Sequence, residues 1–121
     1  MKKRLMVLVL FAGVLTTPAF SAPAARAQAA PQRIEITAKR FEFLPGEITL
    51  KEGQPVIVVL KSEDVAHGLR IRNLNFNLKV KAGGTAELQF TPDKVGDFVG
   101  QCSVFCGSGH GSMKIKVHVV A

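Results

Sequence analysis

From Ile34 to the C-terminus, the chain is divided into short runs in which apolar and polar residues alternate, and this pattern constrains the fold most strongly. A period of two residues is typical of strands that bury one face. Turn signals such as Pro45-Gly46, Gly83-Gly84 and Pro92-Asp93 separate the runs. No long stretch has the spacing of an amphipathic helix. Many short strands with frequent turns predict one all-β domain, either a sandwich or a barrel.

The expected strands lie at residues 34–38, 41–43, 48–50, 56–60, 69–71, 78–80, 86–90, 97–100 and 115–119. The run from Val56 to Leu60 is continuously apolar, so we expect this strand to be buried on both faces. In the last strand, one face carries apolar side chains and the other carries Lys114, Lys116 and His118. The pattern therefore predicts that His118 is a solvated surface histidine.

The N-terminal segment has the features of a secretory signal peptide. The basic residues Lys2–Arg4 precede an apolar run, Leu5–Leu15, and A-x-A cleavage patterns follow around Ala27. The apolar run is shorter than the ~20 residues that a spanning helix needs. We expect residues 1–29 to be a signal peptide with its cleavage region, and residues 30–121 to be an exported, periplasmic domain. The alternative is an uncleaved segment that anchors the domain in a membrane.

The charge of the chain gives no reason to expect a nucleic-acid partner. Removal of Lys2, Lys3, Arg4 and Arg26 would lower the Lys and Arg total from 16 to 12, while Asp and Glu stay at 9, so the net charge would fall from +7 to +3. The remaining cations are scattered, and the chain has neither Trp nor Tyr to stack on bases. These charges therefore indicate a solvated surface.

Soft metal-binding side chains are concentrated in one loop near the C-terminus. Both cysteines, Cys102 and Cys106, lie there with His110 and Met113. Thiolate, imidazole and thioether groups select copper, zinc or iron–sulfur clusters. A thioether disfavours zinc, so we hypothesise a copper site with a redox role. His67 lies in the loop between two predicted strands, and this loop can meet the cysteine loop at the same end of the domain. His67 is therefore the expected further ligand.

Other interpretations of these residues stay open. In an oxidising compartment, Cys102 and Cys106 could form a disulfide, although the loop it closes is small. A structural zinc site could use both cysteines with His67 and His110, leaving Met113 idle. Cys106 and His110 could also form a nucleophile–base pair, but the sequence indicates no substrate pocket.

The loop pattern C-x-x-x-C-x-x-x-H-x-x-M, together with the D-x-x-H motif at Asp64–His67, resembles a known family. It is similar to the cupredoxins, and within them to the copper-binding domain of cytochrome c oxidase subunit II. The resemblance extends from about Phe41 to Val119 and includes Phe43-Leu44-Pro45 and Gly96-Asp97-Phe98. It implies a cupredoxin-like Greek-key β-sandwich and a dinuclear CuA-type centre that holds two copper ions.

The resemblance also implies a role for each residue of the loop. Cys102 and Cys106 would bridge the two copper ions, and His67 and His110 would each bind one of them. Two weak ligands would complete the centre, namely Met113 and the backbone carbonyl of Val104. Glycines of the loop would allow tight turns where side chains would crowd the metals, at Gly107, Gly109 and Gly111.

Three features differ from the family pattern. The family usually has two membrane helices ahead of the domain, a Glu at the position of Val104, and a surface Trp that accepts electrons from cytochrome c. We therefore expect an electron carrier or accessory domain rather than an enzyme by itself. Its expected partner is a c-type cytochrome or another exported redox protein, with a heme-copper oxidase as a further candidate.

Two alternatives to a dinuclear electron carrier remain. A mononuclear blue-copper carrier would need one copper ion and only His67, Cys106, His110 and Met113. A copper chaperone or storage domain that supplies an oxidase could use the same ligands. Cys102 distinguishes the first alternative from the dinuclear centre, because a mononuclear site does not need it.

Overall fold

The computed structural model describes residues 10–19 and 30–121. Its strands are β1 (Gln32–Lys39), β2 (Glu42–Leu44), β3 (Glu47–Lys51), β4 (Val56–Ser62), β5 (His67–Ile71), β6 (Phe76–Val80), β7 (Thr85–Phe90), β8 (Gly96–Cys102) and β9 (Lys114–Val120). Two short 3₁₀ turns, η1 (Arg72–Leu74) and η2 (His110–Ser112), interrupt them. Each predicted strand coincides with an observed one, within a few residues at its ends.

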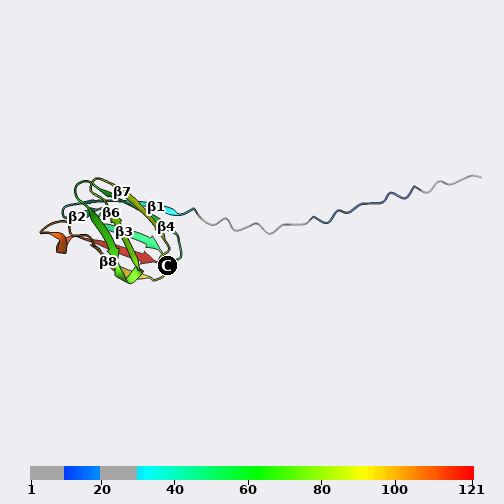
Figure 1. Ribbon diagram of the computed structural model, residues 1–121. Helices are drawn as coiled ribbons and strands as arrows, with labels where there is room; N and C mark the ends of the chain where they lie inside the picture. The colour runs from blue at the N-terminus through cyan, green and yellow to red at the C-terminus, as the bar shows by residue number, and fades with distance from the viewer. Residues whose placement is uncertain (1–9, 20–29) are drawn as a thin grey trace, which may run out of the picture.

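The strands form two sheets, arranged as Figure 1 shows. One has four strands in the order β2-β1-β4-β7, and the other has five in the order β3-β9-β8-β5-β6. The pairs β1–β4 and β3–β9 are parallel, and the remaining pairs are antiparallel. Because strands that are consecutive in the chain often belong to different sheets, the chain wraps around one core. The predicted all-β sandwich is confirmed.

The core lies between the two sheets and is built by the alternation seen in the sequence. On β9, Ile115, Val117 and Val119 are buried, while Lys114 and Lys116 are exposed. On β4, an interior strand of its sheet, Val59 is buried on the face opposite Val58 and Leu60, as expected for a strand covered on both sides. Full burial of one such side chain contributes about 1.5–3 kcal/mol, so the core holds the sheets together.

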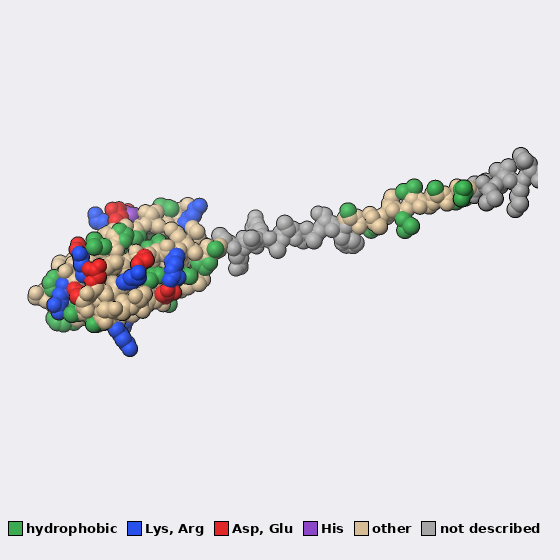
Figure 2. Space-filling model, turned by 90° about the horizontal axis from the view of Figure 1, so that it is seen from above, with side chains coloured by type: hydrophobic (Ala, Val, Ile, Leu, Met, Phe, Trp, Pro, Cys, Tyr) green, Lys and Arg blue, Asp and Glu red, His purple; other side chains and the backbone are tan. Residues whose placement is uncertain are grey.

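The predicted signal peptide and its cleavage patterns fall mainly at residues 1–9 and 20–29, outside the described residues. Residues 10–19 contain neither helix nor strand. Within the part of the chain that the structure describes, no helix has the length and the apolar character of a membrane span. The face of the domain seen in Figure 2 intersperses acidic and basic side chains with apolar ones.

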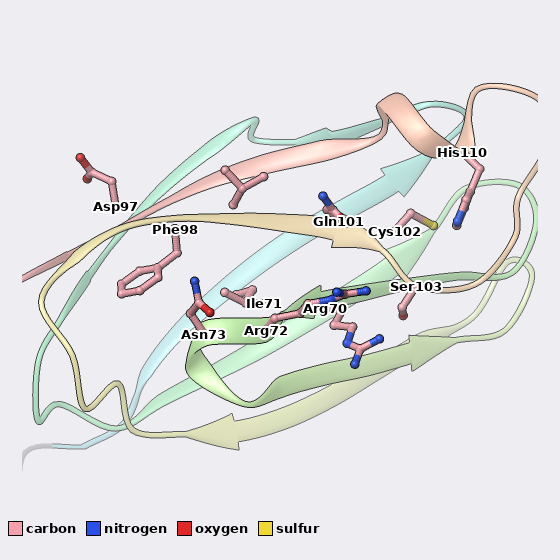
Figure 3. A pocket seen from close by; sticks show the side chains of 11 residues that line it. Arg70, Ile71, Arg72, Asn73, Asp97, Phe98, Gln101, Cys102, Ser103 and His110 are labelled. Atoms are coloured by element: carbon pink, nitrogen blue, oxygen red, sulfur yellow. The ribbon is translucent and has the colours of Figure 1, made fainter.

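Sheet register brings three chain segments to one end of the sandwich. Strand β5 begins at His67, β8 ends at Cys102 and β9 begins at Lys114. Because β5 and β8 are antiparallel, with Leu69 opposite Cys102, the start of one lies beside the end of the other. Figure 3 shows β8 leading to Cys102, with His110 close by. This end of the sandwich therefore collects the residues that the sequence singled out.

Candidate metal centre

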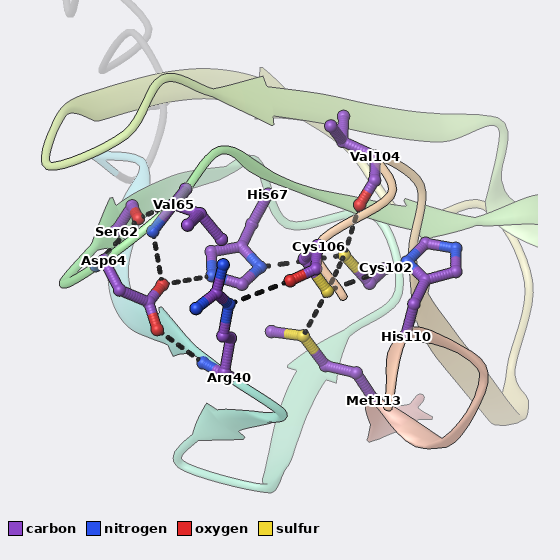
Figure 4. Close-up of polar contacts among 10 residues, drawn as sticks. All are labelled: Arg40, Ser62, Asp64, Val65, His67, Cys102, Val104, Cys106, His110 and Met113. Atoms are coloured by element: carbon purple, nitrogen blue, oxygen red, sulfur yellow. Dashed lines mark hydrogen bonds and ion pairs between the residues drawn. The ribbon is translucent and has the colours of Figure 1, made fainter. Parts of the chain in front are cut away.

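The six predicted ligand residues come from two segments that are distant in the chain. His67 is the first residue of β5, whereas the other five lie between the last residue of β8 and the start of β9, in a segment here called the ligand loop (residues 102–113). Backbone hydrogen bonds hold this loop: the Cys102 N–H donates to the Met113 carbonyl at 3.1 Å, and the Ser103 N–H donates to the Gly68 carbonyl at 3.1 Å. The second bond ties the loop directly to β5. The structure thus brings all six residues together (Figure 4).

The donor atoms form two similar halves around a pair of sulfur atoms. The Sγ atoms of Cys102 and Cys106 lie 3.7 Å apart, and both thiols are free. The Cys102 Sγ is 3.8 Å from His67 Nδ1, and the Cys106 Sγ is 3.7 Å from His110 Nδ1. Each sulfur therefore has one imidazole nitrogen beside it.

A weaker donor completes each half. The Val104 carbonyl oxygen lies 3.1 Å from Cys102 Sγ, and the Met113 Sδ lies 3.8 Å from Cys106 Sγ. Figure 4 shows these contacts as a continuous chain through the two sulfur atoms. The ligand loop and β5 therefore aim six N, O and S donor atoms at one small region.

This donor set fits a soft metal ion. Metal bonds of about 2.0 Å to nitrogen and 2.3 Å to sulfur, at tetrahedral angles, separate two donors by about 3.5–3.8 Å. The observed sulfur–nitrogen and sulfur–sulfur distances of 3.7–3.8 Å agree with that spacing. His67, Cys102 and Cys106 also form a buried group whose ligand atoms all lie within 4.8 Å of one another. Thiolate, imidazole and thioether together favour copper over harder cations.

Burial excludes water from most of the site. His67 and Met113 have 0% exposure, and both cysteines are buried. Val104 and His110 are half-buried, so the site approaches solvent on the side of the ligand loop. Phe105 is 77% exposed and its ring centroid is 5.7 Å from that of His110. The His67 imidazole is therefore fully buried, whereas the His110 imidazole lies beside the exposed ring of Phe105.

Asp64 orients the buried imidazole. Its Oδ1 is 2.6 Å from His67 Nε2, so the Nε2 proton points to the carboxylate and Nδ1 is left to face the sulfur atoms. Partial desolvation opposes ionisation of Asp64, but hydrogen bonds from the Arg40 N–H, His67 and the Val65 N–H outweigh it and lower its pKa to about 2. An ionised carboxylate behind a ligating histidine fixes its tautomer and raises its basicity.

Arg40 is a residue of this site that sequence reasoning missed. Its backbone N–H donates to Asp64 Oδ2 at 2.8 Å, and its Nε donates to the Cys106 carbonyl at 3.0 Å. The same residue thus connects the carboxylate behind His67 with the ligand loop, 66 positions further along the chain. No local signal in the sequence marks this arginine, because its role depends on where the chain returns.

Phe41 limits the space at two glycines of the ligand loop. A Cβ atom at Gly109 would lie 2.5 Å from two Phe41 ring atoms, and one at Gly107, where φ is +136°, would lie 3.0 Å from the same ring. A Cβ at Gly111 would meet no atom within 4 Å. Phe41 is therefore what crowds Gly107 and Gly109, and the expectation that the three glycines leave space for the metals stays a prediction.

Burial also affects the protonation of the Cys106 thiol. Desolvation raises the pKa of Cys106, and the neighbouring Cys102 sulfur raises it further. A metal ion must therefore displace protons in order to bind thiolates here, and its affinity should depend on pH.

His118 lies on β9, away from the site, and is more than a solvated surface histidine. Its side chain is 30% exposed, and Nδ1 is 2.5 Å from Asp97 Oδ1 on β8 while Nε2 contacts Glu47 on β3. The hydrogen bonds to Asp97 and Glu47 raise the pKa of His118. The prediction of an outward position is right, but the imidazole bridges carboxylates on both neighbouring strands.

Comparison with known proteins identifies families and relatives to which this chain is similar. A family profile described as "Cytochrome C oxidase subunit II, periplasmic domain" matches residues 32–120. Cytochrome c oxidase subunit 2 of Thermus thermophilus is 28% identical over 80 residues, which cover 66% of this chain and 59% of that protein. The chain thus spans less than two thirds of the length of that relative.

Solved structures share the fold. The periplasmic domain of subunit II of the cytochrome oxidase of Bradyrhizobium japonicum superposes with a TM-score of 0.66 at 23% identity, over 74% of this chain and 83% of that chain. Auracyanin A, a blue copper protein from Chloroflexus aurantiacus, superposes with a TM-score of 0.62 at 19% identity, over 75% of this chain and all of that chain. The cupredoxin-like architecture is therefore confirmed.

Proposed function

The chain belongs to the family of the cytochrome c oxidase subunit II periplasmic domain, and from that premise we propose that it is an exported copper-binding electron-transfer protein with a dinuclear CuA-type centre. One observation carries this proposal. Two buried, unbonded sulfur atoms lie 3.7 Å apart, and each has one imidazole Nδ1 beside it at 3.7–3.8 Å. A mononuclear site would leave one of the two thiols without a purpose.

Both halves of the site would contribute copper ligands. Cys102 and Cys106 would bridge the ions, His67 and His110 would bind one each, and Met113 and the Val104 carbonyl would be weak ligands. Copper bound there supplies a group that takes up and passes on one electron. The chain's own contribution is a rigid frame, because strand ends and backbone hydrogen bonds hold the donors in place.

Two neighbouring residues would keep that frame unchanged during electron transfer. Asp64 would retain the proton on His67 Nε2, so that Nδ1 stays available to the metal. Arg40 would hold the Cys106 carbonyl and thereby the middle of the ligand loop. Burial of His67 and Met113 would exclude water, so little solvent would have to reorganise around the site.

Residues 1–29 would serve as the signal peptide and residues 30–121 as the copper domain in the periplasm. The word "periplasmic" in the description of the matching family supports this location. A c-type cytochrome or another exported redox protein would exchange electrons with the domain, and a heme-copper oxidase is a further candidate. Val104 and the lack of Trp support transient rather than permanent docking.

A mononuclear blue-copper carrier is the second candidate. His67, Cys106, His110 and Met113 would form its site, and the fold shared with auracyanin A favours it. Copper content and colour separate the two candidates, since only the dinuclear centre needs Cys102 as a bridge.

The decisive experiment compares the protein with its Cys102→Ser variant after reduction of the thiols, anaerobic reconstitution with copper, and reoxidation of the bound copper with ferricyanide, because Cu(I) alone is colourless and EPR-silent. We expect two copper ions per chain in the wild type, with an EPR hyperfine pattern of one electron shared between two ions. The variant should hold one copper ion and change from purple to blue or green. Ser108→Ala, at an exposed position of the same loop, should behave as the wild type. One copper per wild-type chain and an unchanged spectrum in Cys102→Ser would establish the blue-copper candidate instead.

A further inference from the structure

The outer faces of the two sheets differ in how their charges are balanced. On the four-stranded sheet, each cation of the strands forms an ion pair with a carboxylate. These ion pairs are Arg33–Glu87, Lys61–Glu35 and Lys39–Glu42. That face is therefore close to neutral and offers no strong field to a charged partner.

The five-stranded sheet carries an unbalanced group of exposed cations, here called the cationic face. Its members are Arg70, Arg72, Lys79, Lys114 and Lys116. Among the described residues, none of them forms an ion pair. The strands of this sheet carry only two carboxylates, Glu47 and Asp97, and both contact His118. The cationic face therefore keeps its positive charge.

Sheet register places part of this charge in one row beside the ligand loop. Lys114 lies opposite Gln101, Gln101 opposite Arg70, and Arg70 opposite Asn77. With strands about 4.8 Å apart, the row extends roughly 15 Å across four strands. Cys102 directly follows Gln101 in the chain, so the row lies one residue from the site. The row holds two of the cations, Lys114 and Arg70, and its length matches the footprint of a protein rather than that of one small anion.

An open groove joins the cationic face to the site. It has a volume of about 590 Å³, and its lining includes Arg70, Arg72, Cys102 and His110, together with one carboxylate, that of Asp97, which contacts His118. Figure 3 shows the side chains of Arg70 and Arg72 below the end of β8, where both line the groove. Two neighbouring like charges without a carboxylate partner repel each other, and an anionic group placed between them would relieve that repulsion.

We infer that the cationic face is the docking surface for an acidic redox protein, which it positions at the groove beside His110. This inference rests on the proposed electron-transfer function. The acidic partner would bring its redox group to the half-buried imidazole, while positive charge on β5, β6 and β9 attracts and orients it. The neutral sheet on the opposite side would take no part.

The test measures electron exchange between the copper-loaded protein and two probes, an acidic c-type cytochrome and a lysine-rich one. At an ionic strength near 0.01 M, we expect Arg70→Glu and Lys114→Glu each to lower the second-order rate constant with the acidic cytochrome by ~10-fold. The difference should vanish near 1 M salt, where the Debye length is only ~3 Å. An unchanged copper spectrum in each variant confirms that the site itself is intact.

Lys51→Glu is the matched control. It makes the same charge change on the same sheet, but Lys51 lies opposite Val120, at the far end of β9 from the ligand loop. Its rate constant should stay within about twofold of the wild-type value. An equal loss in Lys51→Glu would mean that net charge alone acts, and this would overturn the inference. Faster exchange with the lysine-rich cytochrome would also overturn it.

Chemical-shift mapping provides a readout that does not depend on electron transfer. With both proteins reduced, the acidic cytochrome should shift the amide signals of Asn77, Gln101 and Ser103, and shifts confined to the four-stranded sheet would contradict the inference. Vesicles of phosphatidylglycerol should not bind; binding lost in Arg70→Glu would assign the face to a membrane instead. If neither cytochrome exchanges electrons, the proposed function fails, whereas exchange that ignores Arg70 and Lys114 removes only the docking inference.

Discussion

A single methyl group at Gly109 should disturb the metal site through Phe41. Gly109 has φ −91° and ψ 9°, which alanine can adopt, so the substitution Gly109→Ala brings no backbone strain of its own. Its Cβ would lie 2.5 Å from two ring atoms of Phe41. Carbon atoms normally approach to about 3.5–4.0 Å, so one partner must move by roughly 1 Å. Because Phe41 packs against the core, we expect the ligand loop to move.

The expected cost follows from this displacement. Extra methyl groups in packed regions typically cost ~1–3 kcal/mol. For a domain of this size, each kcal/mol lowers Tm by about 4–8 °C. His110 directly follows Gly109, so the same movement shifts its imidazole away from the position 3.7 Å from Cys106 Sγ. When this entire cost of ~1–3 kcal/mol arises from displaced copper ligands, copper affinity should decrease roughly 5- to 150-fold.

Gly111→Ala is the control, because it adds the same methyl group two residues away, where no atom lies within 4 Å. Both substitutions remove similar backbone freedom from the unfolded chain, so their difference isolates the contact with Phe41. Thermal unfolding of the metal-free proteins and competition with a copper chelator supply the two measurements. Equal Tm values and equal copper affinities in the two variants would refute the reasoning.

Three further outcomes are expected. In the wild type, the raised pKa of His118 stabilises the fold fully below pH 6.5, the ordinary pKa of histidine, and this stabilisation is lost as the pH rises through the higher pKa of the folded state. Urea unfolding of His118→Gln should therefore show no such loss of stability, and pH profiles identical to those of the wild type would contradict the prediction. Asp64→Ala leaves the buried Nε2 of His67 without its acceptor, which should cost about 1–3 kcal/mol in urea unfolding and weaken copper binding; unchanged values would exclude the orienting role. Gly100→Ala places a Cβ 2.6 Å from Ile115 Cγ2, so Tm should fall without any change in the copper spectrum.

Much of the fold could be predicted because its signals are local. Alternation along β9 and the continuous apolar run of β4 reflect which side chains face the core, and neighbouring residues in the chain reveal this directly. The ligand loop was equally visible, since five of the six donor residues lie between Cys102 and Met113. His67 was predicted to be a further ligand because the soft donors of one loop needed an additional ligand from another segment to complete a copper site. The fully buried position of His67 at the start of β5 was not expected.

The sequence by itself therefore determined the strands, the donor residues and the family resemblance, because each depends on residues close together in the chain. Only the tertiary structure decided that Arg40 holds the Cys106 carbonyl, that Phe41 crowds Gly109, and that His118 bridges two carboxylates. It also decided that the cations of β5, β6 and β9 lie on one face. The physical reason is that sheet order and register result from packing energy summed over the whole core, and no short stretch of sequence encodes that sum.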